Sequence, residues 1–198
     1  MTDLFPKDRK KIRERIRRYE RTLRKEYETL GAFDDSYGKR YLLGPLYLLM
    51  DDLEGALKSF AWFEENFPDD SSYPMHYLCW TLALYRSSDL GAAKRKLRET
   101  MLLNLYLVPR LLGIEQDEID MWHGTNIAWK EHLEYIPPEI FNLWDDNARQ
   151  WVRQTYFADD MRLVRDRFIE IHHQLQDESE YMKRVQLVDE AFKLKHMA

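Results

Sequence analysis

The stretch Asp52-Leu53-Glu54-Gly55-Ala56 has a similar second copy 37 residues further along the chain, Asp89-Leu90-Gly91-Ala92-Ala93. Each copy opens a run whose apolar residues recur at helical spacing, and a mostly apolar run ends just before it. Two such runs joined by a short polar segment form a helical hairpin, which cannot bury its apolar face alone. The repetition therefore predicts two consecutive hairpins that stack on each other.

Residues around the two copies match the spacing of a known repeat. The first copy supplies Leu43, Gly44, Tyr47, Ala56, Phe60, Phe63 and Pro68, and the second supplies Trp80, Thr81, Leu84, Ala93, Leu97 and Thr100. This pattern resembles the tetratricopeptide repeat (TPR) family, although Arg40 stands at its early Trp position and the second copy lacks the closing proline. The run 101–113 is similar to a segment that closes such hairpins in some TPR-like proteins. Together the likenesses cover residues 37–113.

The resemblance implies a binding function. TPR-like proteins hold peptides or proteins in a concave groove, which the first helix of each hairpin lines. In the same register, the groove residues here are Tyr41, Leu48, Leu49, Met75, Leu78, Leu82, Tyr85 and Arg86. Because this set is mostly apolar, two interpretations stay open: an open groove that binds a partner, or a groove filled by the flanking helices.

The composition of the whole chain predicts an all-α fold, because seven Gly and seven Pro in 198 residues are too few for the turns of an all-β protein. Three parts are expected: a basic amphipathic N-terminal helix in residues 1–33, the TPR-like region 34–113, and a C-terminal helical cap subdomain 114–198. Helices are predicted over residues 6–30, 53–66, 74–86, 90–103, 139–144, 147–156, 161–176 and 178–196. Between the first two, a helix either starts or restarts at Gly44-Pro45 or is kinked there, and the start or restart is favoured. Residues 114–136 read as irregular, and the three parts are expected to pack as one unit.

The N-terminal helix suggests a second function. Residues 1–30 contain 11 Lys and Arg against 6 Asp and Glu, within a chain of net charge −5. Such a helix attracts phosphates, so nucleic-acid binding is the alternative hypothesis. Its apolar stripe (Ile12, Ile16, Tyr19, Leu23, Tyr27, Leu30) instead favours docking on the protein, where the cations could pair with acidic helices.

No group of residues in the sequence has the spacing of a catalytic or metal site. The single cysteine, Cys79, lies in an apolar run, and Glu170 with His173 forms one i, i+3 pair without a second such pair. The loop segment 121–126 contains Trp122, His123 and Asn126, which could contact a ligand or anchor the loop to the helices. We expect no enzymatic activity, no cofactor and no metal.

Apolar runs of membrane-spanning length and a secretory signal are absent from the sequence, and one cysteine cannot form an intrachain disulfide. The sequence therefore predicts a cytoplasmic location. Taken together, the patterns predict a non-catalytic scaffold or adaptor that binds a protein or peptide.

Overall fold

The computed structural model describes residues 4–33, 35, 37–70 and 73–196, and every regular element among them is helical, which confirms the all-α class. The elements are α1 (Arg9–Leu30), α2 (Arg40–Leu49), α3 (Leu53–Asn66), α4 (Pro74–Arg86), α5 (Leu90–Leu103), α6 (Leu107–Leu111), α7 (Pro138–Asn142), α8 (Asp146–Tyr156), α9 (Asp159–Asp177) and α10 (Tyr181–His196), with short 3-10 helices at Asn126–Ala128 and Lys130–Tyr135.

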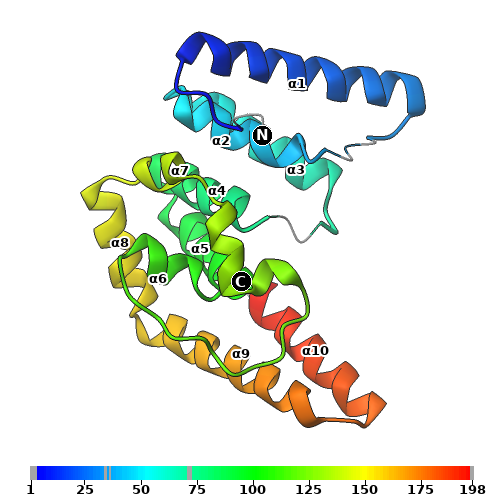
Figure 1. Ribbon diagram of the computed structural model, residues 1–198, viewed down its shortest axis with the longest axis vertical. Helices are drawn as coiled ribbons and strands as arrows, with labels where there is room; N and C mark the ends of the chain where they lie inside the picture. Colours follow the sequence, from blue (N-terminus) through cyan, green and yellow to red (C-terminus); the bar gives the residue numbers. More distant parts are fainter. Residues whose placement is uncertain (1–3, 34, 36, 71–72, 197–198) are drawn as a thin grey trace.

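The helices are arranged from one end of the molecule to the other (Figure 1). Helix α1 runs along α2 and α3 at one end, and α4 to α7 occupy the middle. Helices α9 and α10 form the opposite end, and the irregular segment before α7 runs along α9 before it returns to the middle. The chain therefore surrounds α4 and α5 and leaves α1 and α10 on the outside.

The predicted boundaries of α3, α4 and α5 are confirmed, because local capping sets where these helices begin. The side chains of Asp52 and Asp89 each accept a hydrogen bond from the backbone N–H three residues on, at Gly55 and Ala92. Pro74 opens α4, where a missing N–H costs nothing. The start predicted for the second helix at Gly44-Pro45 is wrong, because α2 begins at Arg40 and contains Pro45.

Asp35 explains the earlier start of α2. Its carboxylate accepts hydrogen bonds from the backbone N–H groups of Lys39 (2.8 Å) and Arg40 (2.7 Å). These groups lie at the N-terminus of α2, where N–H groups have no partner within the helix. This cap and the burial of the apolar face outweigh the roughly 3 kcal/mol that an interior proline costs.

Close approach of α2 and α3 depends on glycine. A Cβ atom at Gly44 would lie 2.4 Å from two ring carbons of Phe60, and one at Gly55 would lie 2.5 Å from the ring of Tyr47. Neither glycine has a positive φ, so the requirement is space rather than backbone conformation. The hairpin therefore closes with an aromatic ring seated on each glycine.

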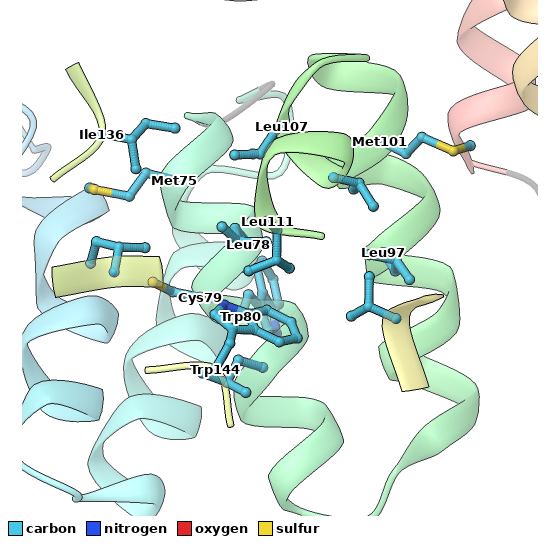
Figure 2. Close-up of a cluster of buried hydrophobic side chains, with 14 of the residues drawn as sticks. Met75, Leu78, Cys79, Trp80, Leu97, Met101, Leu107, Leu111, Ile136 and Trp144 are labelled. Carbon is cyan, nitrogen blue, oxygen red and sulfur yellow. The ribbon is translucent and has the colours of Figure 1, made fainter. Parts of the chain in front are cut away.

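Helix α4 is the centre of the core. Most of its residues are buried, on all sides of the helix, as expected for a helix that is apolar all round. Figure 2 shows Met75, Leu78 and Trp80 of α4 in one cluster with Leu97 of α5 and with residues from beyond the repeat region. The core therefore extends across both hairpins and the C-terminal part.

We expect Gly44→Ala to lower the free energy of unfolding by about 1–3 kcal/mol, because the added methyl group displaces Phe60 from a packed interface. Gly91→Ala is the matched control, since a Cβ there meets nothing closer than 3.7 Å and alanine favours a helix by about 0.5–1 kcal/mol. Urea denaturation followed by circular dichroism measures both. Equal effects at the two glycines would contradict the close-packing account.

His76 predicts a pH dependence of stability. It is fully buried among aromatic rings, with ring centroids 4.6 Å from Phe63 and 5.0 Å from Phe60. Burial, reinforced by the charge of Lys96, lowers the pKa of His76 to about 3. The unfolded chain takes up a proton below a pKa of about 6.5 while the folded chain does not, so this contribution to stability falls as the pH drops from about 6.5 toward 3.

Between pH 7 and pH 5, this uptake removes about 2 kcal/mol from the unfolding free energy. The His76→Gln variant lacks this proton uptake, so its unfolding free energy changes less between pH 7 and pH 5 than that of the wild type. His173→Gln, at an exposed histidine, is the control and retains the wild-type slope. Denaturant titrations at both pH values test this, and identical slopes for wild type and His76→Gln would contradict it.

Candidate functional site

The structure buries half of the residues predicted to line the concave groove and partly buries the other half. Among the eight, Leu48, Met75, Leu78 and Leu82 are buried, with at most 3% of their surface exposed. The other four, Tyr41, Leu49, Tyr85 and Arg86, are partly buried. Of the two interpretations that the sequence left open, the burial supports the filled groove, and the four buried side chains have no surface for a partner.

Residues from the C-terminal half cover the predicted groove. The ring of Tyr85 packs on that of Trp151, with centroids 5.0 Å apart, and Arg86 donates a hydrogen bond of 2.6 Å to the carbonyl oxygen of Leu143. At the other end of α4, Tyr73 packs against His132. Leu107, Leu111, Ile136 and Trp144 complete the cover in Figure 2.

A different surface is hollowed and accessible, between α1 and α3. This surface contains two hollows. The larger one has a volume of about 700 Å³, and Leu43 and Tyr47 of α2 are among its lining residues. Besides Tyr47, three aromatic side chains line it: Tyr27, which is 53% exposed, Phe33 and Trp62. Their rings form a row, with centroids 5.0 Å apart for Tyr27 and Phe33 and 5.1 Å apart for Phe33 and Trp62. The hollow thus offers an aromatic surface beside solvent.

The floor of this hollow contains an unused polar group. Ser59 lines the hollow, is 8% exposed, and its Oγ has no hydrogen-bond partner among the described residues. Buried hydroxyl groups normally have a partner, because an unpaired one costs about 1–3 kcal/mol. A bound molecule could supply the missing partner.

A second hollow, of about 410 Å³, continues along α1 toward its N-terminus. Glu20 and Tyr47 line both hollows, so the two lie next to each other, and we call them together the α1 groove. The second hollow is lined by Arg9, Arg13 and Arg17. The α1 groove is therefore aromatic at one end and basic at the other.

Cations of α1 face solvent along this groove. Residues 7–25 contain 11 Lys and Arg against three acidic residues. Arg9 forms an ion pair with Asp51, 3.1 Å away, whereas Arg13, Arg17, Arg21 and Arg24 are exposed and form no ion pair within the described part of the chain. The acidic helices therefore leave most of the positive charge of α1 available.

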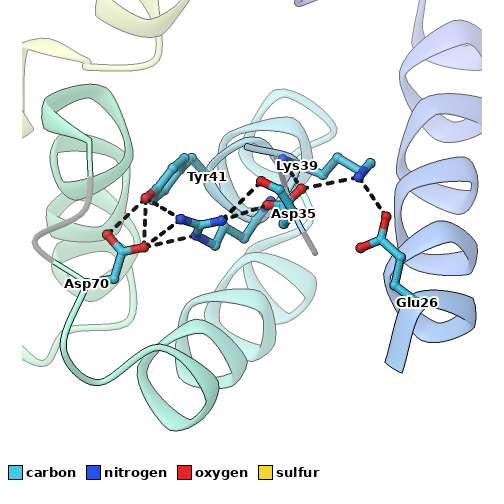
Figure 3. A network of polar contacts seen from close by, with 6 residues as sticks. Glu26, Asp35, Lys39, Tyr41 and Asp70 are labelled. Carbon is cyan, nitrogen blue, oxygen red and sulfur yellow. Dashed lines mark hydrogen bonds and ion pairs between the residues drawn. The ribbon is translucent and has the colours of Figure 1, made fainter. Parts of the chain in front are cut away.

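Two contacts set the position of α1 beside α2. Tyr47 donates a hydrogen bond to Glu20, and burial together with this bond raises the pKa of the Tyr47 hydroxyl. Lys39 donates hydrogen bonds to Glu26 (2.9 Å) and to Asp35 (3.3 Å), which links α1 to the start of α2 (Figure 3). The α1 groove thus has polar contacts holding its walls at two points.

The same network continues to the joint between α3 and α4 (Figure 3). Arg40 donates hydrogen bonds to Asp70 (2.9 Å) and to the hydroxyl of Tyr41 (2.8 Å), which in turn donates to Asp70. Burial and the Asp70 carboxylate raise the pKa of Tyr41 to about 12. Burial alone would lower the pKa of Lys39, but its hydrogen bonds to Glu26 and Asp35 outweigh this, so its pKa is raised.

The irregular segment before α7 is anchored to the helices. Trp122 donates a backbone hydrogen bond of 2.9 Å to the carbonyl oxygen of His172 in α9, and its ring stacks on the imidazole of that histidine. Asn104 donates to the carbonyl oxygens of Ile127 and Trp129. Trp122 therefore anchors the loop, while the ring of Trp129 stays half exposed.

The structure also describes the surroundings of the single cysteine and of the side chains that could bind a metal ion. Cys79 is buried, and burial raises the pKa of its thiol. Within the residues that the structure describes, no group of three or more His, Cys, Asp and Glu side chains could hold a metal ion. Among the same residues, no helix is both long and apolar enough to cross a membrane.

None of the family models, curated proteins or solved structures with which the chain was compared matches it. The TPR-like identity of the repeat therefore stays a prediction. The structure itself supports two consecutive helical pairs, α2 with α3 and α4 with α5.

Sequence reasoning did not select the aromatic residues of the α1 groove as a site. It placed Tyr27 in the docking stripe of the N-terminal helix, and Phe33 and Trp62 carried no role. One signal was available: Trp62 lies between the core positions Phe60 and Phe63 of the repeat and therefore points outward from α3. A large aromatic side chain on the outward face of a helix indicates a surface that a binding partner can contact.

We expect Asp35→Ala to lower the unfolding free energy by about 3–5 kcal/mol, because it leaves Lys39, Arg40 and two helix N–H groups without their buried carboxylate. Asp69→Ala removes an exposed carboxylate from a neighbouring loop and should change stability by less than about 0.5 kcal/mol. Denaturant unfolding of both variants measures this. A loss below about 1 kcal/mol for Asp35→Ala would show that the network does not position α2.

Proposed function

We propose that the protein is a non-catalytic adaptor that binds a protein or peptide in the α1 groove. The observation that supports this most directly is the row of partly exposed aromatic rings from α1 to α3, next to a buried hydroxyl group without a partner. Contiguous apolar surface of this kind is typical of interaction sites, and aromatic residues are enriched where binding energy concentrates.

The partner in this proposal is an acidic amphipathic segment. Its carboxylates lie along the exposed arginines Arg13, Arg17 and Arg24, and an aromatic or aliphatic side chain enters the hollow beside Trp62. From Arg13 to Tyr27 the helix rises about 20 Å, which matches a partner helix of about 14 residues. This arrangement is the helix-in-groove mode of peptide recognition.

Nucleic-acid binding is the second candidate, and the exposed cations of α1 favour it. It uses the charge of α1 but gives no role to Phe33, Trp62 or Ser59. The chain outside α1 is acidic, which opposes a long polyanion. We therefore place it second.

Selection from a library of displayed 16-residue peptides tests the proposal, because it does not require the natural partner to be identified first. We expect the enriched peptides to contain several Asp or Glu residues and one aromatic or aliphatic anchor. Trp62→Ala should weaken their binding by at least about tenfold, which corresponds to about 1.4 kcal/mol. Fluorescence polarisation with synthetic copies of the peptides measures the change.

Matched variants separate the groove from other surfaces. Trp129→Ala removes another partly exposed tryptophan outside the groove and should leave binding unchanged. Arg17→Glu should weaken binding and flatten its dependence on salt, whereas Arg162→Glu on α9 should not. Peptides that bind wild type and Trp62→Ala equally would contradict the proposal, and salt-sensitive binding of RNA or DNA lost only in Arg17→Glu would support the second candidate.

A further inference from the structure

Helix α10 is apolar on two separate faces. Its inner face includes Leu187, Ala191 and Leu194, which pack on the core beside α9 and α5. Its outer stripe consists of Tyr181, Val185, Val188 and Phe192, whose exposed fractions are 75%, 43%, 48% and 61%. A surface helix normally carries polar residues on its outer face. Within the described residues, the one ring contact of this stripe is that of Phe192 with His196 of the same helix, with centroids 4.4 Å apart, and most of the stripe faces solvent.

The order of side chains in the outer stripe is the same from either end. Two aromatic residues, Tyr181 and Phe192, enclose two valines, Val185 and Val188, with spacings of four, three and four residues. An interface between two identical copies related by a two-fold axis needs a surface that complements itself. An antiparallel partner helix meets this requirement, because each aromatic ring then lies opposite the other aromatic position and the valines meet at the centre.

The size of the stripe fits a weak pair. A buried aromatic side chain covers roughly 150–250 Å², so the exposed fractions of Tyr181 and Phe192 leave on the order of 100–150 Å² at each. The four rings of two copies then contribute about 500 Å², to which the valines and Met182, which is 58% exposed, add further area. The total area buried by such a dimer is below the roughly 1,200–2,000 Å² of stable complexes and within the range of transient complexes.

We propose that the outer stripe of α10 joins two copies of the chain in an antiparallel, two-fold symmetric dimer. The axis passes the middle of the stripe, between Gln186 and Leu187. The α1 groove lies at the other end of the molecule (Figure 1), so a dimer leaves both grooves open and presents two of them. Two linked sites bind a partner with repeated segments more tightly than one.

Sedimentation velocity measures the dimer directly. The mass should increase from monomer to dimer between low micromolar and near-millimolar protein. Val188→Lys should keep the protein monomeric over the whole range, because it places a charge at the centre of the apolar contact. Gln186→Lys adds the same charge at an exposed position on another face of α10 and should leave the dimer intact, and circular dichroism confirms that both variants fold.

Cysteine substitutions test the antiparallel geometry. With a rise of about 1.5 Å per residue, the two copies of Val185 lie about 4–5 Å apart along the helix axis, and the two copies of Tyr181 about 16–17 Å apart. Val185→Cys should therefore form a disulfide-linked dimer under mild oxidation, whereas Tyr181→Cys should not. The wild-type protein is the control, since Cys79 is buried and burial raises the pKa of its thiol.

Three results would overturn this proposal. A protein that stays monomeric at all concentrations has no such dimer. A dimer that persists in Val188→Lys uses another surface, and efficient crosslinking of Tyr181→Cys alone shows a parallel pair. Because none of these results depends on peptide binding in the α1 groove, the two proposals succeed or fail separately.

Discussion

The structure depends on the enclosure of α4. Its apolar residues occupy all sides of the helix, so no arrangement with one side in water would be stable. Helices α2 and α3 cover it on one side and α5 on another, and the segment from α6 to α8 covers the remainder. The contacts of Tyr73, Tyr85 and Arg86 with the C-terminal half fix this cover at both ends of α4.

Enclosure also explains which surfaces remain available. Once α4 is covered, four of the residues that the resemblance selected, Leu48, Met75, Leu78 and Leu82, have no surface for a partner. The first hairpin keeps a free edge at α3, and α1 lies along α2 without covering α3 completely. The α1 groove exists for this reason, with Trp62 and Phe33 at its aromatic end. At the other end of the molecule α10 closes the core with its inner face and leaves its outer face exposed.

Local signals made much of the fold predictable. Asp52 and Asp89 fix the starts of α3 and α5 through a side-chain cap within three residues, and Pro74 marks the start of α4, so these elements could be read from the sequence. The start of α2 could not, because it depends on Asp35, which lies five residues before Arg40 and not at the residue directly before the helix. The fate of Met75, Leu78 and Leu82 was also open, since an apolar groove and an apolar core have the same pattern. Only the position of residues 107–151 decides between them, and no local pattern specifies it.

Native-state hydrogen exchange tests the enclosure of α4 most directly. The amide groups of residues 75–82 should exchange only through global unfolding, with an opening free energy equal to that of the whole protein and the same dependence on denaturant. The exposed end of α1, near Tyr27, should exchange through smaller openings. If residues 75–82 instead exchange together with residues 107–144 through an opening well below the global free energy, the cover is removable. The predicted concave groove would then be accessible, which would contradict the permanent enclosure of α4.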